Sequence, residues 1–384
     1  MDVAWLDASQ QVATDLVQAM GGRVDSIDVR EVHASSDGDV VAGFDAMVAW
    51  AGHAPCSELL FVATDDVAGA MQAWRYPADP LLPGLAAAVD PLEVAAFLGC
   101  LQASLEVITL RPCRRAVVRV WGDGVDVHLK VVAPGSAQFL ADRHLALAAA
   151  GVVVPAVLAI DDVRGWVVLD TLPGRTLDEC LDSDDVPLLA ADAVWSLVES
   201  IGSVHLEPRL DVPGTSTHAV RHARLIGNVL PSLADRVHRL ASEIVTRWPS
   251  PRLGTVHGDL HPGQLLIDAA GELVGVLDVD GAGTGDPLDD IGRMIAHVMV
   301  TASAQRHAGS RRWWFAAQLV DAAANRVSDA DLSTRIAASV LAHAAGPWRA
   351  QGNAWPSEVE RLVSLAEDVA AAGAASVIRS RRSP

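Results

Sequence analysis

Residues 256–268 read VHGDLHPGQLLID, and after a short connection residues 273–287 read LVGVLDVDGAGTGDP. The apolar runs LLI and LVGVL flank the polar and small residues DAAGE, which is the pattern of a β-hairpin. A hairpin places the loop before its first strand close to the residue that follows its second strand. We therefore expect Asp259, Gln264 and Asp278 to converge in space despite their separation in sequence.

These side chains, together with one lysine, are those that phosphoryl transfer requires. A carboxylate takes the proton of the acceptor hydroxyl, hard oxygen ligands hold Mg²⁺ against the phosphates, and a fixed cation steadies the triphosphate. Asp259 fits the first role, Asp278 with the amide oxygen of Gln264 the second, and Lys130 the third. Lys130 is the only lysine among 29 basic residues. Lysine and arginine are not interchangeable at a tight site, so one explanation is that this position kept lysine for its compact ammonium group; the alternative is that the single lysine is there by chance.

The composition narrows the classes of partner. The net charge of −19 argues against nucleic acid, because a phosphate backbone favours a basic protein face. The charge is compatible with a cationic small substrate, and also with an acidic surface that serves only solubility. No uncharged stretch reaches the roughly 20 residues of a membrane-spanning helix, and the N-terminus lacks the pattern of a signal peptide. We expect a cytoplasmic protein with no nucleic-acid or membrane partner.

The chain divides into three regions. Residues 1–99 combine a helix with strand-like segments, residues 100–173 read as strands around one helix, and residues 174–384 are mainly helical. A small β-rich region followed by a large α-rich region is an α+β two-lobe layout. In the third region, amphipathic patterns predict helices over residues 186–204, 219–247, 287–304, 311–326 and 357–378.

The quoted segment resembles the catalytic loop of the aminoglycoside phosphotransferase family, which has the protein-kinase-like fold. That family shows His-Gly-Asp, an amide side chain five residues later, and an apolar strand that ends in a metal-binding aspartate. The stretches His257-Gly258-Asp259, Gln264 and Leu277-Asp278 match in order and spacing, and Asp290 resembles part of the continuation into the next helix. The resemblance implies a β-rich N-lobe for the second region and an α-rich C-lobe for the third, while a similarity to maltokinases implies an N-terminal cap subdomain for the first.

The resemblance also implies roles at the phosphate-transfer centre. Asp259 would be the base, Asp278 the main Mg²⁺ ligand and Gln264 the second ligand. Asp280 would contact either the metal or the substrate, and both alternatives stay open. His257 and Asp290 would brace the loop rather than react. Independently of the resemblance, the histidines show no metal-ligand spacing, so a bracing role is also expected of His261 rather than zinc binding.

For the nucleotide, the resemblance implies ATP, although the sequence does not separate ATP from GTP. Lys130 would pair with the phosphates, and backbone groups of the hinge Asp170-Thr171-Leu172 would hold adenine. The turn at residues 111–115 has no glycine, unlike the usual phosphate-covering loop, so Arg114 or Arg115 would contact phosphate instead. The glutamate that should pair with Lys130 is missing, and Asp142 or Gln138 stands in a suitable position. Gln264 is a further departure, since most of the family has Asn there.

A second resemblance narrows the range of molecules that could accept the phosphoryl group. The N-terminal region, Gln264 and the stretch GPWRAQGNAWP at residues 346–356 are similar to actinobacterial glucosamine kinases and to maltokinases. Trp side chains stack on sugar rings and polar side chains bind hydroxyls, while acidic groups would meet an ammonium. Packing of a helix-loop junction is the alternative for the tryptophans. The candidate acceptor contacts are Asp259, Asp280, Asp286, Trp348, Arg349, Gln351 and Trp355.

Three functions therefore remain open. The first is an amino-sugar kinase, most specifically one that converts glucosamine to glucosamine 6-phosphate. The second is a kinase of maltose or of an aminoglycoside antibiotic. The third is a nucleotide-binding pseudokinase that regulates a partner, which the glycine-free turn and the missing glutamate favour. The presence of Asp259, Gln264, Asp278 and Lys130 argues against the third, and the sequence does not indicate an oligomeric state.

Overall fold

The computed structural model describes residues 3–34, 40–64, 70–206, 215–304, 309–350, 352 and 354–382. The chain divides into two compact units. The first unit consists of Met1–Ala141, Val157–Thr171 and Trp348–Trp355, and the second of Asp142–Ala156, Leu172–Pro347 and Pro356–Pro384. The first unit is rich in strands and the second in helices, which confirms the expected α+β class. The three-region boundaries at residues 99 and 173 stay a prediction.

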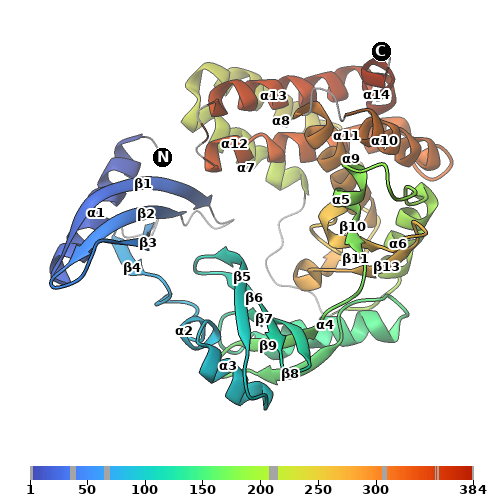
Figure 1. Ribbon diagram of the computed structural model, residues 1–384. Helices are drawn as coiled ribbons and strands as arrows, with labels where there is room; N and C mark the ends of the chain where they lie inside the picture. Colours follow the sequence, from blue (N-terminus) through green and yellow to red (C-terminus); the bar gives the residue numbers. More distant parts are fainter. Residues whose placement is uncertain are drawn as a thin grey trace. The chain divides into compact units, whose positions relative to one another are not determined.

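The first unit begins with a helix and an antiparallel sheet of order β1-β2-β3-β4. The elements are α1 (Val3–Ala19), β1 (Gly22–Ala34), β2 (Val40–Trp50), β3 (Cys56–Thr64) and β4 (Met71–Arg75). Helix α1 packs along the sheet (Figure 1), and the buried side chains of Val17, Phe44 and Leu60 belong to the core between them. This part of the chain thus has a hydrophobic core of its own.

A second antiparallel sheet of the first unit has the order β5-β6-β7-β9-β8. The elements here are α2 (Leu85–Ala88), α3 (Pro91–Leu98), β5 (Ser104–Arg111), β6 (Arg115–Gly122), β7 (Val125–Val131), β8 (Val157–Asp161) and β9 (Trp166–Asp170). Its largest core side chain is Trp166, which is fully buried, stacks edge-on against Phe97 and donates its indole N–H to the Gly84 carbonyl at 3.0 Å. The helices after β4 are thereby fixed to the sheet.

The turn between β5 and β6 is shaped by a buried carboxylate from the preceding connector. Cys113 has a φ of 61°, a left-handed conformation that costs a non-glycine residue about 1–2 kcal/mol. Its backbone N–H donates to Asp79 Oδ2 at 2.7 Å. The other oxygen of Asp79 accepts the N–H groups of Leu81 and Leu82 at 2.9 and 3.0 Å. One carboxylate therefore holds both the connector and the turn.

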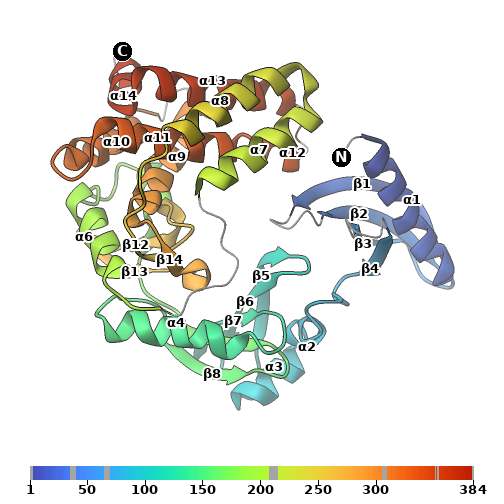
Figure 2. The ribbon, with the colours of Figure 1, turned by 180° about the vertical axis from the view of Figure 1, so that it is seen from behind.

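Helices make up most of the second unit, and Figure 2 shows α7 and α8 side by side. The helices are α5 (Leu177–Leu181), α6 (Ala191–Gly202), α7 (Thr215–Val229), α8 (Ala234–Thr246), α9 (Pro287–Ala304), α10 (Gly309–Ala323), α11 (Asp329–His343), α13 (Trp355–Ala372) and α14 (Ala374–Arg382). Two more, α4 (Ala137–Ala149) and α12 (Gly346–Arg349), are divided between the units, and Trp355 at the start of α13 also belongs to the first unit. Among the described residues, no helix is long and apolar enough to cross a membrane.

Short strands interrupt these helices and carry the predicted site. They are β10 (Arg175–Thr176), β11 (Gly254–Val256), β12 (Leu265–Ile267), β13 (Leu273–Val276) and β14 (Gly283–Gly285), with the 3₁₀ turns η1 (Pro231–Leu233), η2 (Pro262–Gln264) and η3 (Val279–Gly281). Strands β12 and β13 pair antiparallel, with Leu265 opposite Val276. This confirms the hairpin that the sequence predicts.

Gly165, which precedes β9, offers a test of the β5–β9 sheet. It has a φ of +70°, and a Cβ there would lie 2.0 Å from the Val132 carbonyl oxygen. Gly165→Ala should therefore lower the free energy of unfolding by clearly more than the roughly 1–2 kcal/mol of a left-handed alanine alone. The matched control is Gly124→Ala, where φ is +80° and nothing lies within 4 Å. Urea unfolding of both variants measures the difference, and equal losses would contradict the close approach.

Candidate active site

The hairpin brings two of the predicted metal ligands together. The Leu277 N–H donates to the Gln264 carbonyl oxygen at 2.8 Å, which closes the hairpin next to Asp278. The side-chain nitrogen of Gln264 lies 3.4 Å from Asp278 Oδ2. The convergence of these two side chains is thus as the hairpin pattern predicts, although their role in binding metal stays a prediction.

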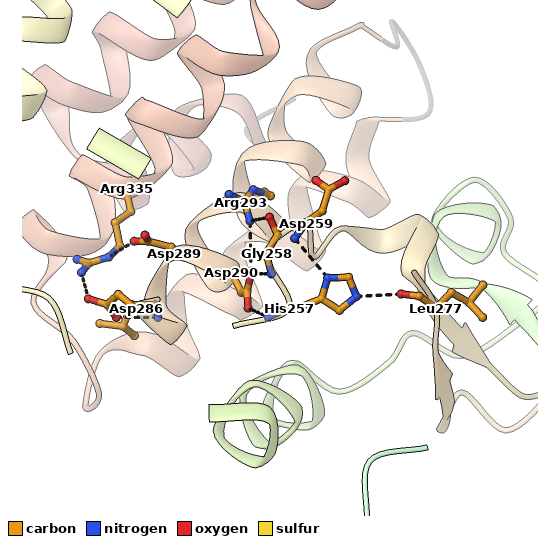
Figure 3. A network of polar contacts seen from close by, with 10 residues as sticks. His257, Gly258, Asp259, Leu277, Asp286, Asp289, Asp290, Arg293 and Arg335 are labelled. Carbon is orange, nitrogen blue, oxygen red and sulfur yellow. Dashed lines mark hydrogen bonds and ion pairs between the residues drawn. The ribbon is translucent and has the colours of Figure 1, made fainter. Parts of the chain in front are cut away.

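The loop that carries Asp259 is anchored to the first turn of α9 (Figure 3). Asp290 is 1% exposed and accepts the N–H groups of His257 at 2.6 Å and Gly258 at 3.0 Å. Arg293 lies one turn further along α9, donates to the Gly258 carbonyl and is 3.4 Å from Asp290 Oδ1. Burial raises the pKa of Asp290, while the charges of Arg293 and His257 and the two N–H donors oppose that rise.

The His257 ring joins this loop to the end of β13. The ring is fully buried; Nδ1 accepts the Asp259 N–H at 3.3 Å, and Nε2 donates to the Leu277 carbonyl at 2.9 Å. One neutral tautomer satisfies both bonds. The half-buried carboxylate of Asp259 extends away from the ring (Figure 3). The backbone on either side of the site is therefore held while the Asp259 carboxylate points elsewhere.

Three histidines stack beside the same loop. The rings of His261 and His297 are 4.8 Å apart and nearly parallel, and His343 meets His297 edge-on at 5.3 Å. Burial, followed by the neighbouring charges of His343 and His261, lowers the pKa of His297 to about 3. Burial also lowers the pKa of His261. His261 further approaches Gln264, with the two Nε2 atoms 3.2 Å apart.

Asp278 and Asp280 lie where the chain turns sharply after β13. Asp278 has a φ of 55° and a ψ of 49°, a left-handed conformation that aspartate tolerates better than most residues. Asp280 is half-buried in η3. Within the described part of the chain, no three His, Cys, Asp or Glu side chains form a metal cluster.

Asp286, a predicted substrate contact, is occupied within the fold. It is 5% exposed, accepts the N–H groups of Arg252 and Leu288 at 3.0 Å each, and pairs with the buried guanidinium of Arg335. Arg335 also contacts Asp289 at 2.9 Å (Figure 3). These bonds give Asp286 a structural role within the fold, and its contact with an acceptor stays a prediction.

The predicted nucleotide residues are divided between the units. In the first unit, Lys130 is 4% exposed on β7, Asp170 ends β9 and accepts the Thr171 N–H at 2.9 Å, and exposed Arg114 lies in the β5–β6 turn. In the second unit, Leu172 packs on Gly275, and Asp142 is exposed on α4. Their roles toward a nucleotide stay predictions.

Of the stretch at residues 346–356 that is predicted to contact the acceptor, Trp348–Trp355 belongs to the first unit and the remaining residues to the second. Trp348 is 5% exposed, and Trp355 is half-buried. Arg349 has a buried Nε with no hydrogen-bond partner among the described residues, and burial followed by the charges of Arg111 and Arg114 lowers its pKa. Gln351 lies outside the described residues. The burial of Trp348 fits the packing alternative, and sugar contact by this segment stays a prediction.

Comparison with known proteins identifies the family. The sequence model of the phosphotransferase enzyme family, APH, matches residues 114–317, more than half of the chain. The chain therefore belongs to this family and is a small-molecule phosphotransferase with an alcohol group as acceptor. No match was found among curated proteins.

Solved structures confirm the two-lobe, protein-kinase-like fold. The GDP complex of aminoglycoside 2'-phosphotransferase-IIIa is 17% identical, with 72% of this chain and 98% of that chain covered and a TM-score of 0.50. A thermostable mutant of aminoglycoside phosphotransferase APH(4)-Ia is 16% identical, with 76% of this chain and 99% of that chain covered and a TM-score of 0.50. A choline/ethanolamine kinase family protein from Mesorhizobium loti is 15% identical, with 78% of this chain and 97% of that chain covered and a TM-score of 0.50. At these identities the likeness establishes the fold alone.

Sequence reasoning did not single out Arg293, although a signal for it exists. Asp290 and Arg293 stand three residues apart in a predicted helix, a spacing at which opposite charges meet on one face. The contact of His261 with Gln264 had no such signal, because it depends on the η2 turn between them. Arg293 and His261 therefore extend the site beyond the residues that match the family motif.

Loss of the Asp290 carboxylate should release the loop. Asp290→Ala leaves Arg293 and two backbone N–H groups without their buried acceptor, so we expect a loss of about 3–5 kcal/mol in the free energy of unfolding. Faster hydrogen exchange at the His257 and Gly258 amides should accompany it. The control Asp321→Ala, at an exposed position of α10, should stay within about 0.5 kcal/mol. Unchanged exchange at both amides would refute the anchoring role.

Proposed function

We propose that this phosphotransferase is an ATP-dependent amino-sugar kinase whose acceptor is glucosamine and whose product is glucosamine 6-phosphate. The observation that carries the kinase assignment is the approach of Gln264 to Asp278 beside the anchored Asp259 loop. The acceptor assignment rests on the likeness of residues 346–356 and of the N-terminal region to glucosamine kinases.

Asp259 is the proposed base. The acceptor hydroxyl oxygen forms a bond to the γ-phosphorus of ATP, the bond from that phosphorus to the β,γ-bridging oxygen breaks, and ADP leaves. The hydroxyl proton passes to the Asp259 carboxylate, which becomes neutral. The bonds of Asp290 and His257 to the loop backbone support this role, because they fix the base before the acceptor arrives.

The residues present fit a magnesium ion. Magnesium prefers oxygen ligands and usually takes one or two from the protein, the rest being phosphate oxygens and water. Asp278 and the amide of Gln264 lie within 3.4 Å of each other, and Asp280 follows in η3 as a further candidate. When bound, Mg²⁺ neutralises charge on the transferring phosphates.

Lys130 is the proposed partner of the nucleotide phosphates, and its 4% exposure means that its charge is held away from bulk water. Arg114 is the proposed substitute for a glycine-rich loop, and Asp142 the proposed carboxylate partner of Lys130. Asp170 and Leu172 are the proposed adenine hinge. The similar 2'-phosphotransferase-IIIa was solved with GDP, so GTP is the alternative phosphate donor to ATP.

Other acceptors remain as alternatives within the same chemistry. Several similar structures are of aminoglycoside phosphotransferases, which supports an aminoglycoside as second candidate, and the maltokinase likeness supports maltose. A pseudokinase is disfavoured by the anchored loop around Asp259, since nucleotide binding alone does not require a fixed base.

A panel of acceptors tests the assignment. With Mg-ATP, we expect ADP release to be fastest with glucosamine, because acidic side chains such as Asp259 and Asp280 would meet its ammonium. Glucose and N-acetylglucosamine, which lack that charge, should show a kcat/KM at least about tenfold lower, the equivalent of one charge-assisted contact. A preference for maltose or kanamycin would replace the acceptor and keep the kinase. Mg-ATP binding without turnover of any acceptor would favour the pseudokinase.

Asp259→Asn tests the base. The amide keeps the shape of the carboxylate and cannot take the hydroxyl proton, so kcat should fall by about 10²–10⁴-fold. Nucleotide affinity, measured by calorimetry, should change little, because the base is assigned to the acceptor. Asp321→Asn, on the exposed face of α10, is the matched charge control. A variant at position 259 that keeps a tenth or more of the wild-type kcat would remove Asp259 as base.

A further inference from the structure

The contact between His261 and Gln264 carries a constraint on where the Gln264 oxygen lies. His261 precedes the η2 turn, and its Nδ1 accepts the Gly263 N–H at 3.1 Å. Its other ring nitrogen, Nε2, is 3.2 Å from the side-chain Nε2 of Gln264. The same amide nitrogen is 3.4 Å from Asp278 Oδ2. Two partners, one imidazole and one carboxylate, thus face a single amide atom.

The protonation of the ring follows from the Gly263 contact. A nitrogen that accepts an N–H carries no proton, so the neutral ring of His261 has its proton on Nε2. If the ring becomes cationic, Nε2 is protonated as well. The one state with a bare Nε2 has a proton on Nδ1, and that proton would point at the Gly263 N–H. Both the neutral ring with its proton on Nε2 and the cationic ring therefore have Nε2 as a donor toward Gln264.

A donor requires an acceptor opposite it. The oxygen and nitrogen ends of a glutamine amide are nearly identical in shape, and hydrogen bonding decides which end faces which partner. Facing Nε2–H, the Gln264 amide presents its oxygen rather than its nitrogen. We propose that His261 is a positioning residue that turns the side-chain oxygen of Gln264 toward Asp278 and so completes a pair of oxygen ligands for a divalent cation.

The resulting pair suits such a cation. The Gln264 oxygen then lies at the position 3.4 Å from Asp278 Oδ2. Two neighbouring ligands of an octahedral Mg²⁺, each about 2.0–2.1 Å from the metal, are roughly 2.9 Å apart, so a small side-chain rotation closes the difference. Without a cation, the Gln264 oxygen and Asp278 Oδ2 repel each other, which favours turning the amide so that its nitrogen faces Asp278. The N–H donor of His261 opposes that rotation.

Neighbouring residues fix the ring that performs this task. His297 stacks on it at 4.8 Å, and a Cβ on Gly263 would lie 2.9 Å from its Cε1, so only glycine leaves room for the ring there. Gln264 has one more rotatable bond than the asparagine found in most of the family, and a longer arm loses more entropy when it is fixed. A side-chain donor beside it reduces that loss before the cation arrives. The inference rests on the proposed role of Gln264 as a metal ligand.

Binding of Mn²⁺ tests the proposal without relying on turnover. The affinity of the full chain for Mn²⁺, with a non-hydrolysable ATP analogue bound, is measured by electron paramagnetic resonance of the free ion. His261→Phe keeps the ring against His297 and removes Nε2–H, and it should weaken Mn²⁺ by about 10–100-fold, as loss of a residue that orients a ligand does. His261→Gln returns an N–H donor at that distance and should restore most of the affinity. His297→Phe, which touches the ring but not Gln264, is the control and should match wild type.

A double-mutant cycle separates positioning from packing. A carboxylate has oxygen at both ends, so Gln264→Glu needs no donor to orient it. In that background, His261→Phe should change Mn²⁺ affinity by less than about twofold, within the usual error of additive effects. An equal loss in both backgrounds, or wild-type affinity in His261→Phe alone, would overturn the proposal. Gln264→Ala identifies the other failure: if Mn²⁺ affinity is unchanged there, Gln264 is no ligand, and the proposed metal site falls with the inference.

Discussion

The site depends on one buried carboxylate. Asp290, in the first turn of α9, accepts two successive backbone N–H groups of the loop that carries Asp259, and Arg293 completes the contact from the same helix. A backbone held at two consecutive residues has little freedom left, so the direction in which Asp259 leaves the chain is set by α9. The His257 ring extends this control to the end of β13. Base and metal-binding candidates thus share one rigid support, which is what phosphoryl transfer by positioning requires.

Much of this arrangement follows from local sequence pattern. Two apolar runs around a polar connection predict the β12–β13 hairpin, and the hairpin alone predicts that Gln264 approaches Asp278. The α+β class follows in the same way from the order of strand-like and helix-like segments. Where apolar residues repeat along one face of a helix, as in α9, the predicted bounds of residues 287–304 agree with the structure.

Other features were not predictable because tertiary packing decides them. Helix α11 was not predicted, because residues 332–341 are all buried and polar Ser333, Thr334, Arg335 and Ser339 among them interrupt the apolar period of a helix face. The pattern over residues 219–247 is broken into α7 and α8 at Pro231, and that over residues 357–378 is divided into α13 and α14 at Gly373. The buried pairing of Asp286 with Arg335 also depends on the fold, since the two residues are 49 positions apart in the sequence. Ring stacking beside Gln264 likewise has no signature along the chain.

The conformation of the β5–β6 turn depends on the carboxylate of Asp79, which lies well before the turn in the sequence. In a glycine-rich loop the left-handed residue supplies its own conformational freedom, whereas here Cys113 is held by an acceptor 34 residues earlier in the sequence. The shape of this turn is therefore inherited from the connector after β4. A shortened gene that begins at residue 100 would encode the turn and omit the carboxylate that holds it.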